Sequence, residues 1–203
     1  MTFDSNTANG FSIVKLNKTT DGSTASTFGH GLSSAPEVII LKRTNGTEDW
    51  YVYHTSMGNA ARVQLNSNAA KTTGTNVWDQ TDPTSSVFTV ESFNAGEAIA
   101  YCFHSVAGFS KFGSYTGSSS AKTVTTGFQA DFVMIKRTSG TEDWNIIDSV
   151  RGGDKRLYPD LTNAEVDESS DYITFASTSF TITQTSNTCL LYTSPSPRDA
   201  TLS

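Results

Sequence analysis

The 203-residue sequence has only two cysteines, and it contains no apolar run long enough to cross a membrane as a helix. Two cysteines are too few for a disulfide framework, and a membrane helix needs about 18 or more consecutive apolar residues. The first residues, MTFDSNTANGF, also lack the basic region and apolar stretch of a secretory signal. Cys102 lies in the apolar run AIAYCF, which predicts a buried, unreactive thiol.

Positive charge is scarce as well: 14 Lys and Arg stand against 20 Asp and Glu, for a net charge of −6. Phosphate binding needs clustered Lys and Arg, so this balance excludes nucleic acid as a partner. Charged residues make up only 17% of the chain, while aromatic residues reach 11%, too many for a disordered chain. The abundant Thr, Val, Ile, Phe and Tyr suit half-buried strands, and the composition predicts a soluble all-β protein.

A nine-residue string occurs twice with a single change. KRTNGTEDW spans Lys42–Trp50, and KRTSGTEDW spans Lys136–Trp144, at an offset of 94 residues. The string GFS recurs at Gly10 and Gly108, and VFTV near residue 87 is matched by SFTI near residue 179. Matches that keep their order while their offsets drift are typical of a duplicated module with loop insertions. The sequence therefore predicts a tandem repeat of roughly 95 residues.

Within each copy the apolar pattern predicts about seven short strands and no helix. The clearest are GFSIVKL, EVIILKR, WYVYH, ARVQLN, SSVFTVES and EAIAYCFHS in the first copy. Such a pattern favours an antiparallel β-sandwich, of jelly-roll or concanavalin-like form. The repeated string then connects the strands of a hairpin, with Asn-Gly at the turn and Trp starting the returning strand by packing inward. A ligand site shared by the two loops is the alternative.

The end of the chain breaks the repeat. A strand like GEAIAYCFHS is expected after SFTI, but the sequence reads QTSNTCLLYTSPSPRDATLS, and proline cannot donate to a sheet ladder. We therefore expect a first module at residues 1–106, a second at 107–188 lacking its last strand, and a non-native tail at 189–203. The string CLLYTSPSPRDATLS resembles a translated sequencing-adapter read-through, and a natural proline-rich linker is the alternative.

The strings GFSKFGSYTG, TGFQADFVMIKRTSGTEDWNIIDSVRGG and LYPDLTNAE, with their counterparts in the first copy, resemble a repeat module of marine bacteriophage virion proteins. The resemblance covers residues 10–188. It implies a tail-fibre-like, largely β virion protein, assembled in the host cytoplasm, that recognises a host-surface glycan or protein. Its partners would be other virion subunits, with a homotrimer among the arrangements, and neither nucleic acid nor inserted membrane. A carbohydrate-binding module of a glycan-degrading virion enzyme and a purely structural spacer are the alternatives.

Six residues are the candidates for ligand contacts. Trp78 lies in the loop TNVWDQTDPT, has no counterpart in the second copy, and could stack on a sugar ring. Asp79 and Asp82 follow Trp78 in the same loop. Arg151, Lys155 and Arg156 form the one local basic cluster, which could meet an anionic glycan, although a solvated hairpin turn explains it equally.

Catalytic and metal-binding patterns are weak. Glycoside hydrolysis needs two placed carboxylates, but the acidic residues lie in turn-rich stretches, and no G-x-S-x-G string offers a nucleophile. We expect no enzyme and no cofactor. Calcium remains an alternative at the acidic loops Asp79–Asp82 and Asp167–Asp171, though neither has the EF-hand pattern. The single histidines His30, His54 and His104 are typical of surface or strand-end positions.

Overall fold

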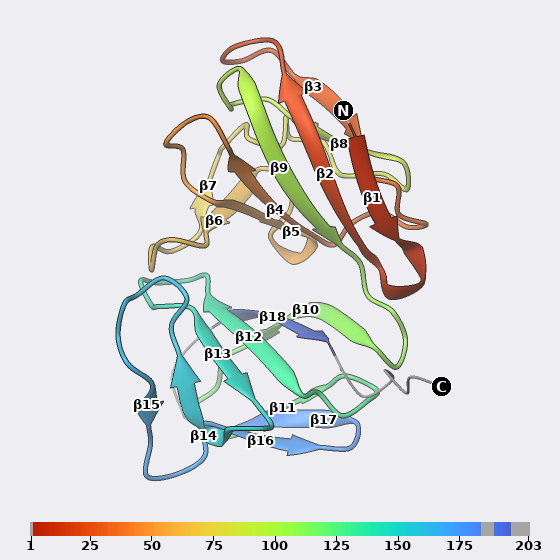
Figure 1. Ribbon diagram of the computed structural model, residues 1–203. Helices are drawn as coiled ribbons and strands as arrows, with labels where there is room; N and C mark the ends of the chain where they lie inside the picture. The colour runs from red at the N-terminus through yellow and green to blue at the C-terminus, as the bar shows by residue number, and fades with distance from the viewer. Residues whose placement is uncertain (1, 184–188, 196–203) are drawn as a thin grey trace. The chain divides into compact units, whose positions relative to one another are not determined.

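The computed structural model describes residues 2–183 and 189–195, and within them the protein is all-β (Figure 1). All named strand pairs are antiparallel, which confirms the predicted fold class. The two helical segments in this part of the chain are the single 3₁₀ turns η1 (Thr7–Asn9) and η2 (Thr55–Met57). No helix in these ranges is long and apolar enough to span a membrane.

The chain divides into two compact units. The first comprises Met1–Asn66 and Lys71–His104, and the second comprises Ser67–Ala70 and Ser105–Ser203. The division after His104 lies close to the module boundary expected at residue 106. The short segment Ser67–Ala70 was not expected to belong with the second unit.

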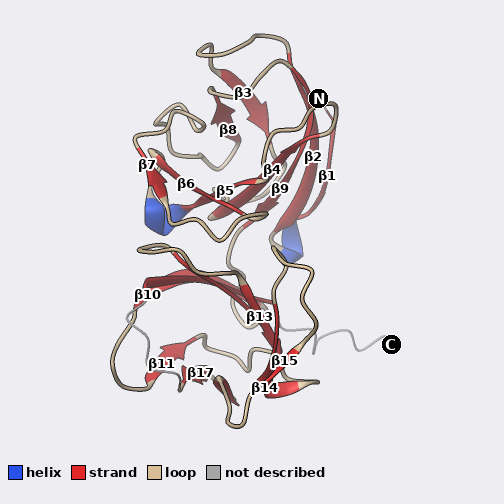
Figure 2. Ribbon diagram, turned by 90° about the vertical axis from the view of Figure 1, so that its left-hand side faces the viewer, coloured by secondary structure: helices blue, strands red, loops and turns tan. Residues whose placement is uncertain are grey.

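The first unit contains a seven-stranded sheet and a two-stranded sheet (Figure 2). In the larger sheet the order is β1-β2-β9-β4-β5-β6-β7, and β3 pairs with β8 in the smaller one. The strands are β1 (Thr2–Asn6), β2 (Phe11–Lys18), β3 (Ser26–Gly29), β4 (Val38–Arg43), β5 (Tyr51–His54), β6 (Ala61–Gln64), β7 (Thr72–Thr73), β8 (Val87–Val90) and β9 (Gly96–Phe103).

Alternating side chains from these two sheets build one core, as expected when two sheets pack face to face. Val14 and Leu41 from the larger sheet are buried with Phe28 and Phe88 from the smaller one. Cys102 lies in the same core and is fully buried, as predicted. Burial raises the pKa of its thiol to about 12, so the nucleophilic thiolate form is scarce.

The second unit repeats this layout with a six-stranded and a three-stranded sheet. The order in the larger sheet is β10-β18-β12-β13-β14-β15, and in the smaller sheet it is β11-β17-β16. The strands are β10 (Ser110–Thr116), β11 (Lys122–Thr125), β12 (Phe132–Arg137), β13 (Asn145–Asp148), β14 (Gly152–Leu157), β15 (Val166–Asp167), β16 (Ile173–Ala176), β17 (Ser179–Ile182) and β18 (Cys189–Pro195).

Most strands of the two units correspond; β1 in the first unit and β16 in the second have no counterpart. The run β2-β9-β4-β5-β6-β7 has the same order as β10-β18-β12-β13-β14-β15. Each smaller sheet also carries a cross-strand threonine pair at the same place: Thr27 and Thr89 hydroxyls lie 3.4 Å apart, and Thr123 and Thr181 hydroxyls 2.9 Å. This common order is the arrangement that a duplicated module would produce.

The expectation that the second module lacks its last strand is wrong. β18 lies where the first unit has β9, and it pairs with both β10 and β12. The proline argument fails because Pro195 is the final residue of the strand, where a missing backbone N–H interrupts no further ladder. The rest of the predicted tail, residues 196–203, lies outside the described residues.

Candidate functional site

In the first unit the repeated string forms a loop whose side chains bond to one another and to the loop's own backbone. Lys42 Nζ donates to the backbone carbonyl of Glu48, and Arg43 Nη1 lies 2.7 Å from Glu48 Oε1. Asn94 Nδ2 donates to the same carboxylate oxygen at 2.7 Å. Burial acts to raise the pKa of Glu48, but its hydrogen bonds with Asn94 and Arg43 outweigh burial and hold that pKa below its ordinary value.

Asp49 closes the other half of this loop. Its two carboxylate oxygens accept from Gln64 Nε2 at 2.5 Å and from Asn66 Nδ2 at 2.8 Å. Asn66 Oδ1 in turn accepts from the backbone N–H of Trp50 at 3.0 Å. The charged side chains of the loop are therefore occupied in holding its backbone.

The second copy keeps the lysine bond and the arginine ion pair. Lys136 Nζ donates to the carbonyl of Glu142 at 2.5 Å, and Arg137 Nη1 lies 3.7 Å from Glu142 Oε2. Lys136 is fully buried and also donates to the carbonyl of Asn68 at 2.9 Å, within the same unit. Burial lowers the pKa of Lys136, although three nearby carboxylates oppose that effect.

Asp160 is a member of this loop that the sequence patterns did not reveal. Its Oδ1 accepts from the backbone N–H of Trp144 at 3.1 Å, as Asn66 does for Trp50. Each acceptor stands 16 residues after its tryptophan. That equal spacing, within the 94-residue offset of the repeat, is the signal that could have identified the pair.

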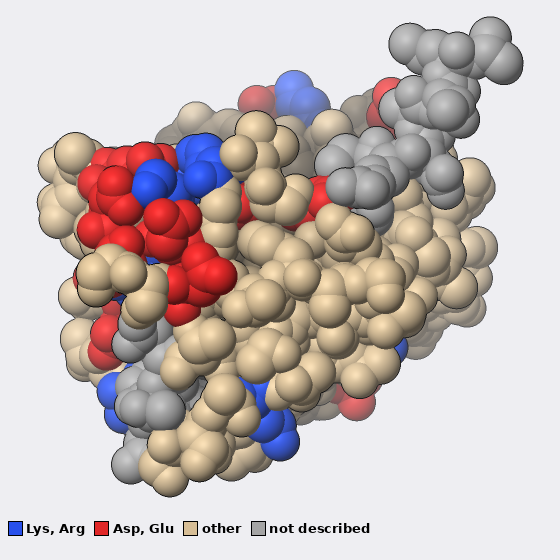
Figure 3. Space-filling view, turned by 90° about the horizontal axis from the view of Figure 1, so that it is seen from below, with Lys and Arg blue, Asp and Glu red and all other residues tan. Residues whose placement is uncertain are grey.

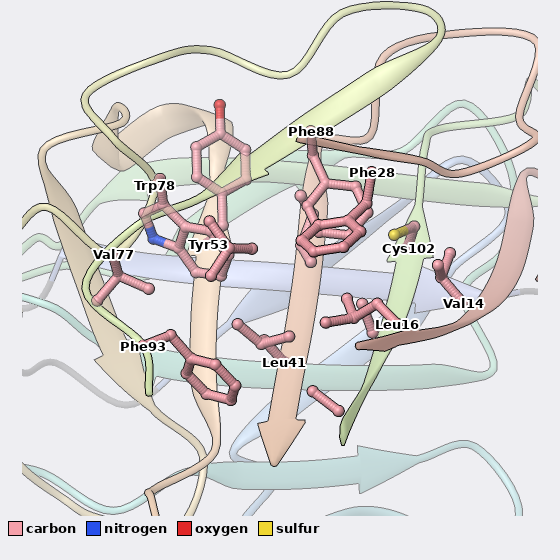
Figure 4. Packing of buried hydrophobic residues seen from close by; sticks show 14 of the residues in the cluster. Val14, Leu16, Phe28, Leu41, Tyr53, Val77, Trp78, Phe88, Phe93 and Cys102 are labelled. Atoms are coloured by element: carbon pink, nitrogen blue, oxygen red, sulfur yellow. The ribbon is translucent and has the colours of Figure 1, made fainter. Parts of the chain in front are cut away.

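Trp78 does not project from its loop, and the prediction of a ligand contact there is wrong. Its side chain is 1% exposed and packs edge-on against Tyr53, with ring centroids 5.7 Å apart (Figure 4). Val77 and Phe93 lie in the same core cluster. Directly after Trp78, Asp79 and Gln80 both adopt left-handed backbone angles, so the chain turns sharply where the indole enters the core.

Asp79 and Asp82 remain near the surface beside this turn. Asp79 is half-buried, and its N–H donates to the carbonyl of Asn76 at 3.0 Å. Asp82 is exposed and lies beside the Tyr53 hydroxyl. Burial, together with the Asp82 carboxylate, raises the pKa of Tyr53 to about 12. The two aspartates therefore flank a buried aromatic pair and not an exposed stacking platform.

The basic cluster is not a solvated turn throughout, because Gly152–Leu157 is strand β14. Arg151, just before it, donates to Asp148 Oδ2 at 2.6 Å and to Glu165 Oε2 at 2.8 Å. Although burial opposes it, pairing with Glu165 and Asp148 raises the pKa of the Arg151 guanidinium. The charge of Arg151 is therefore shared by two carboxylates.

The other two basic residues are paired in the same way. Lys155 Nζ lies 2.9 Å from Asp154 Oδ2 and 2.6 Å from Asp167 Oδ1, and these bonds raise its pKa. Arg156 pairs with Glu168.

Three cations thus stand among five carboxylates. Figure 3, which views the molecule from below, shows acidic and basic side chains gathered in one region. This finding corrects the expectation of a basic site, because the positive charges of Arg151, Lys155 and Arg156 are already offset. An additional anion would have to compete with these carboxylates.

The histidines are buried and not on the surface, but they do stand at strand ends: His54 is the last residue of β5, and His30 and His104 directly follow β3 and β9. His30 is fully buried; its Nδ1 accepts from the N–H of Leu32 at 3.1 Å, and its Nε2 lies 3.1 Å from the carbonyl of Thr84. His54 is 1% exposed, and its Nδ1 accepts from the N–H of Ser56 at 3.1 Å. Burial lowers the pKa of His54 to about 3. His104 is also buried.

Within residues 2–183 and 189–195, no three His, Cys, Asp or Glu side chains gather in a way that could hold a metal ion. The acidic stretch Asp167–Asp171 is partly taken up by the ion pairs of Lys155 and Arg156. Calcium at these loops stays a prediction.

Comparison with known proteins gives a family match. No curated protein and no solved structure matches the chain. A family model described as a domain of unknown function, DUF7483, matches residues 1–191. The match spans both units and includes the first residues of β18. Because it covers nearly the whole sequence, the chain belongs to the DUF7483 family.

Proposed function

We propose that this chain is a non-enzymatic structural protein of a phage virion, a tail-fibre or appendage piece whose β-sandwich units are displayed for recognition of a host surface. One observation supports the proposal most: in both units the duplicated string holds its own loop together through hydrogen bonds. We call this set of bonds the brace. Lys42 and Lys136 each bind a loop carbonyl, and Trp50 and Trp144 each donate to an acceptor 16 residues later. The virion setting rests on the sequence resemblance.

The brace explains why a charged motif recurs without catalysis. Glycan cleavage needs one carboxyl group as an acid and a second as a base or nucleophile, with solvent and substrate between the two. In the first unit Glu48 and Asp49 instead accept hydrogen bonds from Arg43, Gln64 and Asn66. Because the loop stabilises the fold, its duplication is expected wherever the fold itself is duplicated. We therefore favour a display protein over an enzyme.

A hydroxyl-rich sheet face is the best surface for recognition. On the three-stranded sheet of the second unit, the row Thr123, Thr181 and Thr174 lies beside Thr125 and Ser179. These side chains alternate with Val124, Phe180 and Ile182, which face the core. Thr123, Thr125 and Thr174 are exposed. Such a face offers hydroxyl donors and acceptors to a neutral glycan, while the ion-paired region disfavours an anionic one.

The test is binding of the 203-residue chain to a glycan array and to bacterial cells. We expect saturable binding to neutral glycans, lost in a Thr125→Val and Thr174→Val double variant that keeps the β-branched shape. Thr27→Val, on the smaller sheet of the first unit, is the matched control and should bind normally. Absence of binding by the native chain would leave the spacer alternative. Release of reducing ends from any glycan would overturn the non-enzymatic assignment.

A further inference from the structure

The brace is closed by an amide in the first unit and by a carboxylate in the second. Asn66 accepts from the Trp50 N–H through Oδ1 and donates through Nδ2 to Asp49 Oδ1 at 2.8 Å. Asp160 accepts from the Trp144 N–H through Oδ1 in the same way. Its second oxygen, Oδ2, therefore occupies the place of an amide donor and not of an acceptor.

The two oxygens that this exchange affects are both buried. Asp160 Oδ2 and Asp143 Oδ1 have no hydrogen-bond partner among residues 2–183 and 189–195. Asp143 is the counterpart of Asp49, 94 residues later. In the first unit Gln64 donates to the other oxygen of Asp49, and the residue 94 positions after Gln64 is Tyr158. Two buried carboxylate oxygens without donors repel each other and cost free energy.

The charged groups around the pair do not remove this conflict. Lys136, from β12, is within electrostatic range of both aspartates, but its ammonium donates to the carbonyls of Glu142 and Asn68. The neighbouring Arg137 pairs with the Glu142 carboxylate. Burial, with the Asp143 charge, raises the pKa of Asp160, although hydrogen bonds from the backbone N–H groups of Asp160 and Trp144, and the charge of Lys136, act to lower it. The site therefore favours a neutral acid at residue 160.

We propose that Asp160 carries a proton on Oδ2 and donates it to Asp143 Oδ1, so that a shared proton closes the second unit's loop where an amide closes the first. The second loop is consequently sensitive to pH where Asp160 ionises, and the first loop, closed by an amide at that place, lacks this response. An acid with a raised pKa in the folded state contributes stability at low pH, and this contribution is lost as the pH rises through that value. The loop before Trp144 should tighten in acid and loosen as Asp160 ionises.

Hydrogen exchange of two backbone amides tests the proposal within one molecule. We expect the protection factor of the Trp144 N–H to fall by about tenfold as the pH rises from about 4 to about 8, while that of Trp50 stays level. Asp160→Asn restores the amide of the first unit and should remove the fall. Asn66→Asp, its matched reciprocal, should transfer the same fall to Trp50. Both substitutions keep side-chain size, so the fold should survive.

Three results would overturn the assignment. The first is an equal pH response of Trp144 in the native chain and in Asp160→Asn. The second is an unchanged Trp50 amide in Asn66→Asp. The third is recovery of Trp144 protection at high pH on adding millimolar calcium to the native chain but not to Asp160→Asn, because the oxygens would then hold a cation in place of a proton.

Discussion

Replacing Trp78 by alanine should destabilise the first unit strongly and leave ligand binding untouched except through unfolding. The indole is 1% exposed and forms an edge-on pair with Tyr53. Truncation of a buried tryptophan typically costs about 3–5 kcal/mol, of which the aromatic pair contributes roughly 0.5–1.5 kcal/mol. We expect a loss in that range, measured by urea unfolding of the full chain followed by circular dichroism.

Trp78→Phe is the informative companion variant. Trp78 Nε1 has no acceptor within the described part of the chain, so phenylalanine removes a buried unsatisfied donor and keeps a ring opposite Tyr53. We expect it to cost about 1–2 kcal/mol less than alanine. The reasoning is refuted if Trp78→Ala unfolds with a loss below about 1 kcal/mol. Loss of glycan binding at unchanged stability would restore Trp78 as a ligand contact.

Two further predictions concern a close contact and a buried base. A Cβ at Gly153 would overlap the Ile173 carbonyl oxygen, so Gly153→Ala should cost at least about 1–3 kcal/mol in urea unfolding. An unchanged midpoint would contradict the β14–β16 packing. Burial lowers the pKa of His54 to about 3, so its stabilising contribution is present above about pH 6.5 and is lost as the pH falls towards 3. His54→Asn, whose Oδ1 replaces the Nδ1 acceptor, should flatten the acid side of the stability curve, and an identical acid limb would count against this account.

The sequence pattern was sufficient for the strands that carry the repeat. β4 and β5 were expected as a hairpin because a β-branched apolar run precedes a polar loop with Asn-Gly, and the two strands pair as predicted. Short strands such as β3 and β7 were not predicted individually, since four or two residues carry too little periodicity.

The candidate site was harder to predict because side-chain direction depends on backbone angles that composition does not reveal. Neither Asp79 nor Gln80 is a glycine, so nothing in the string TNVWDQTDPT predicts two left-handed residues directly after Trp78. The tryptophans of the repeat also differ in burial: Trp144 is buried as expected, while Trp50 is only half-buried. The basic cluster suggested a site for an anionic ligand because its carboxylate partners lie up to 14 residues away in sequence and are not evident from the local string.

The central claim is that the repeated string braces the fold, and substitution of its lysines tests this most directly. Lys42→Met and Lys136→Met remove the donors to the Glu48 and Glu142 carbonyls, whereas Lys71→Met changes an exposed side chain. In urea unfolding we predict a loss of about 1–3 kcal/mol for each of the first two variants, and a change within about 0.5 kcal/mol for the third. If Lys42→Met and Lys136→Met are as stable as the native chain, the string is no brace and its duplication must serve a ligand.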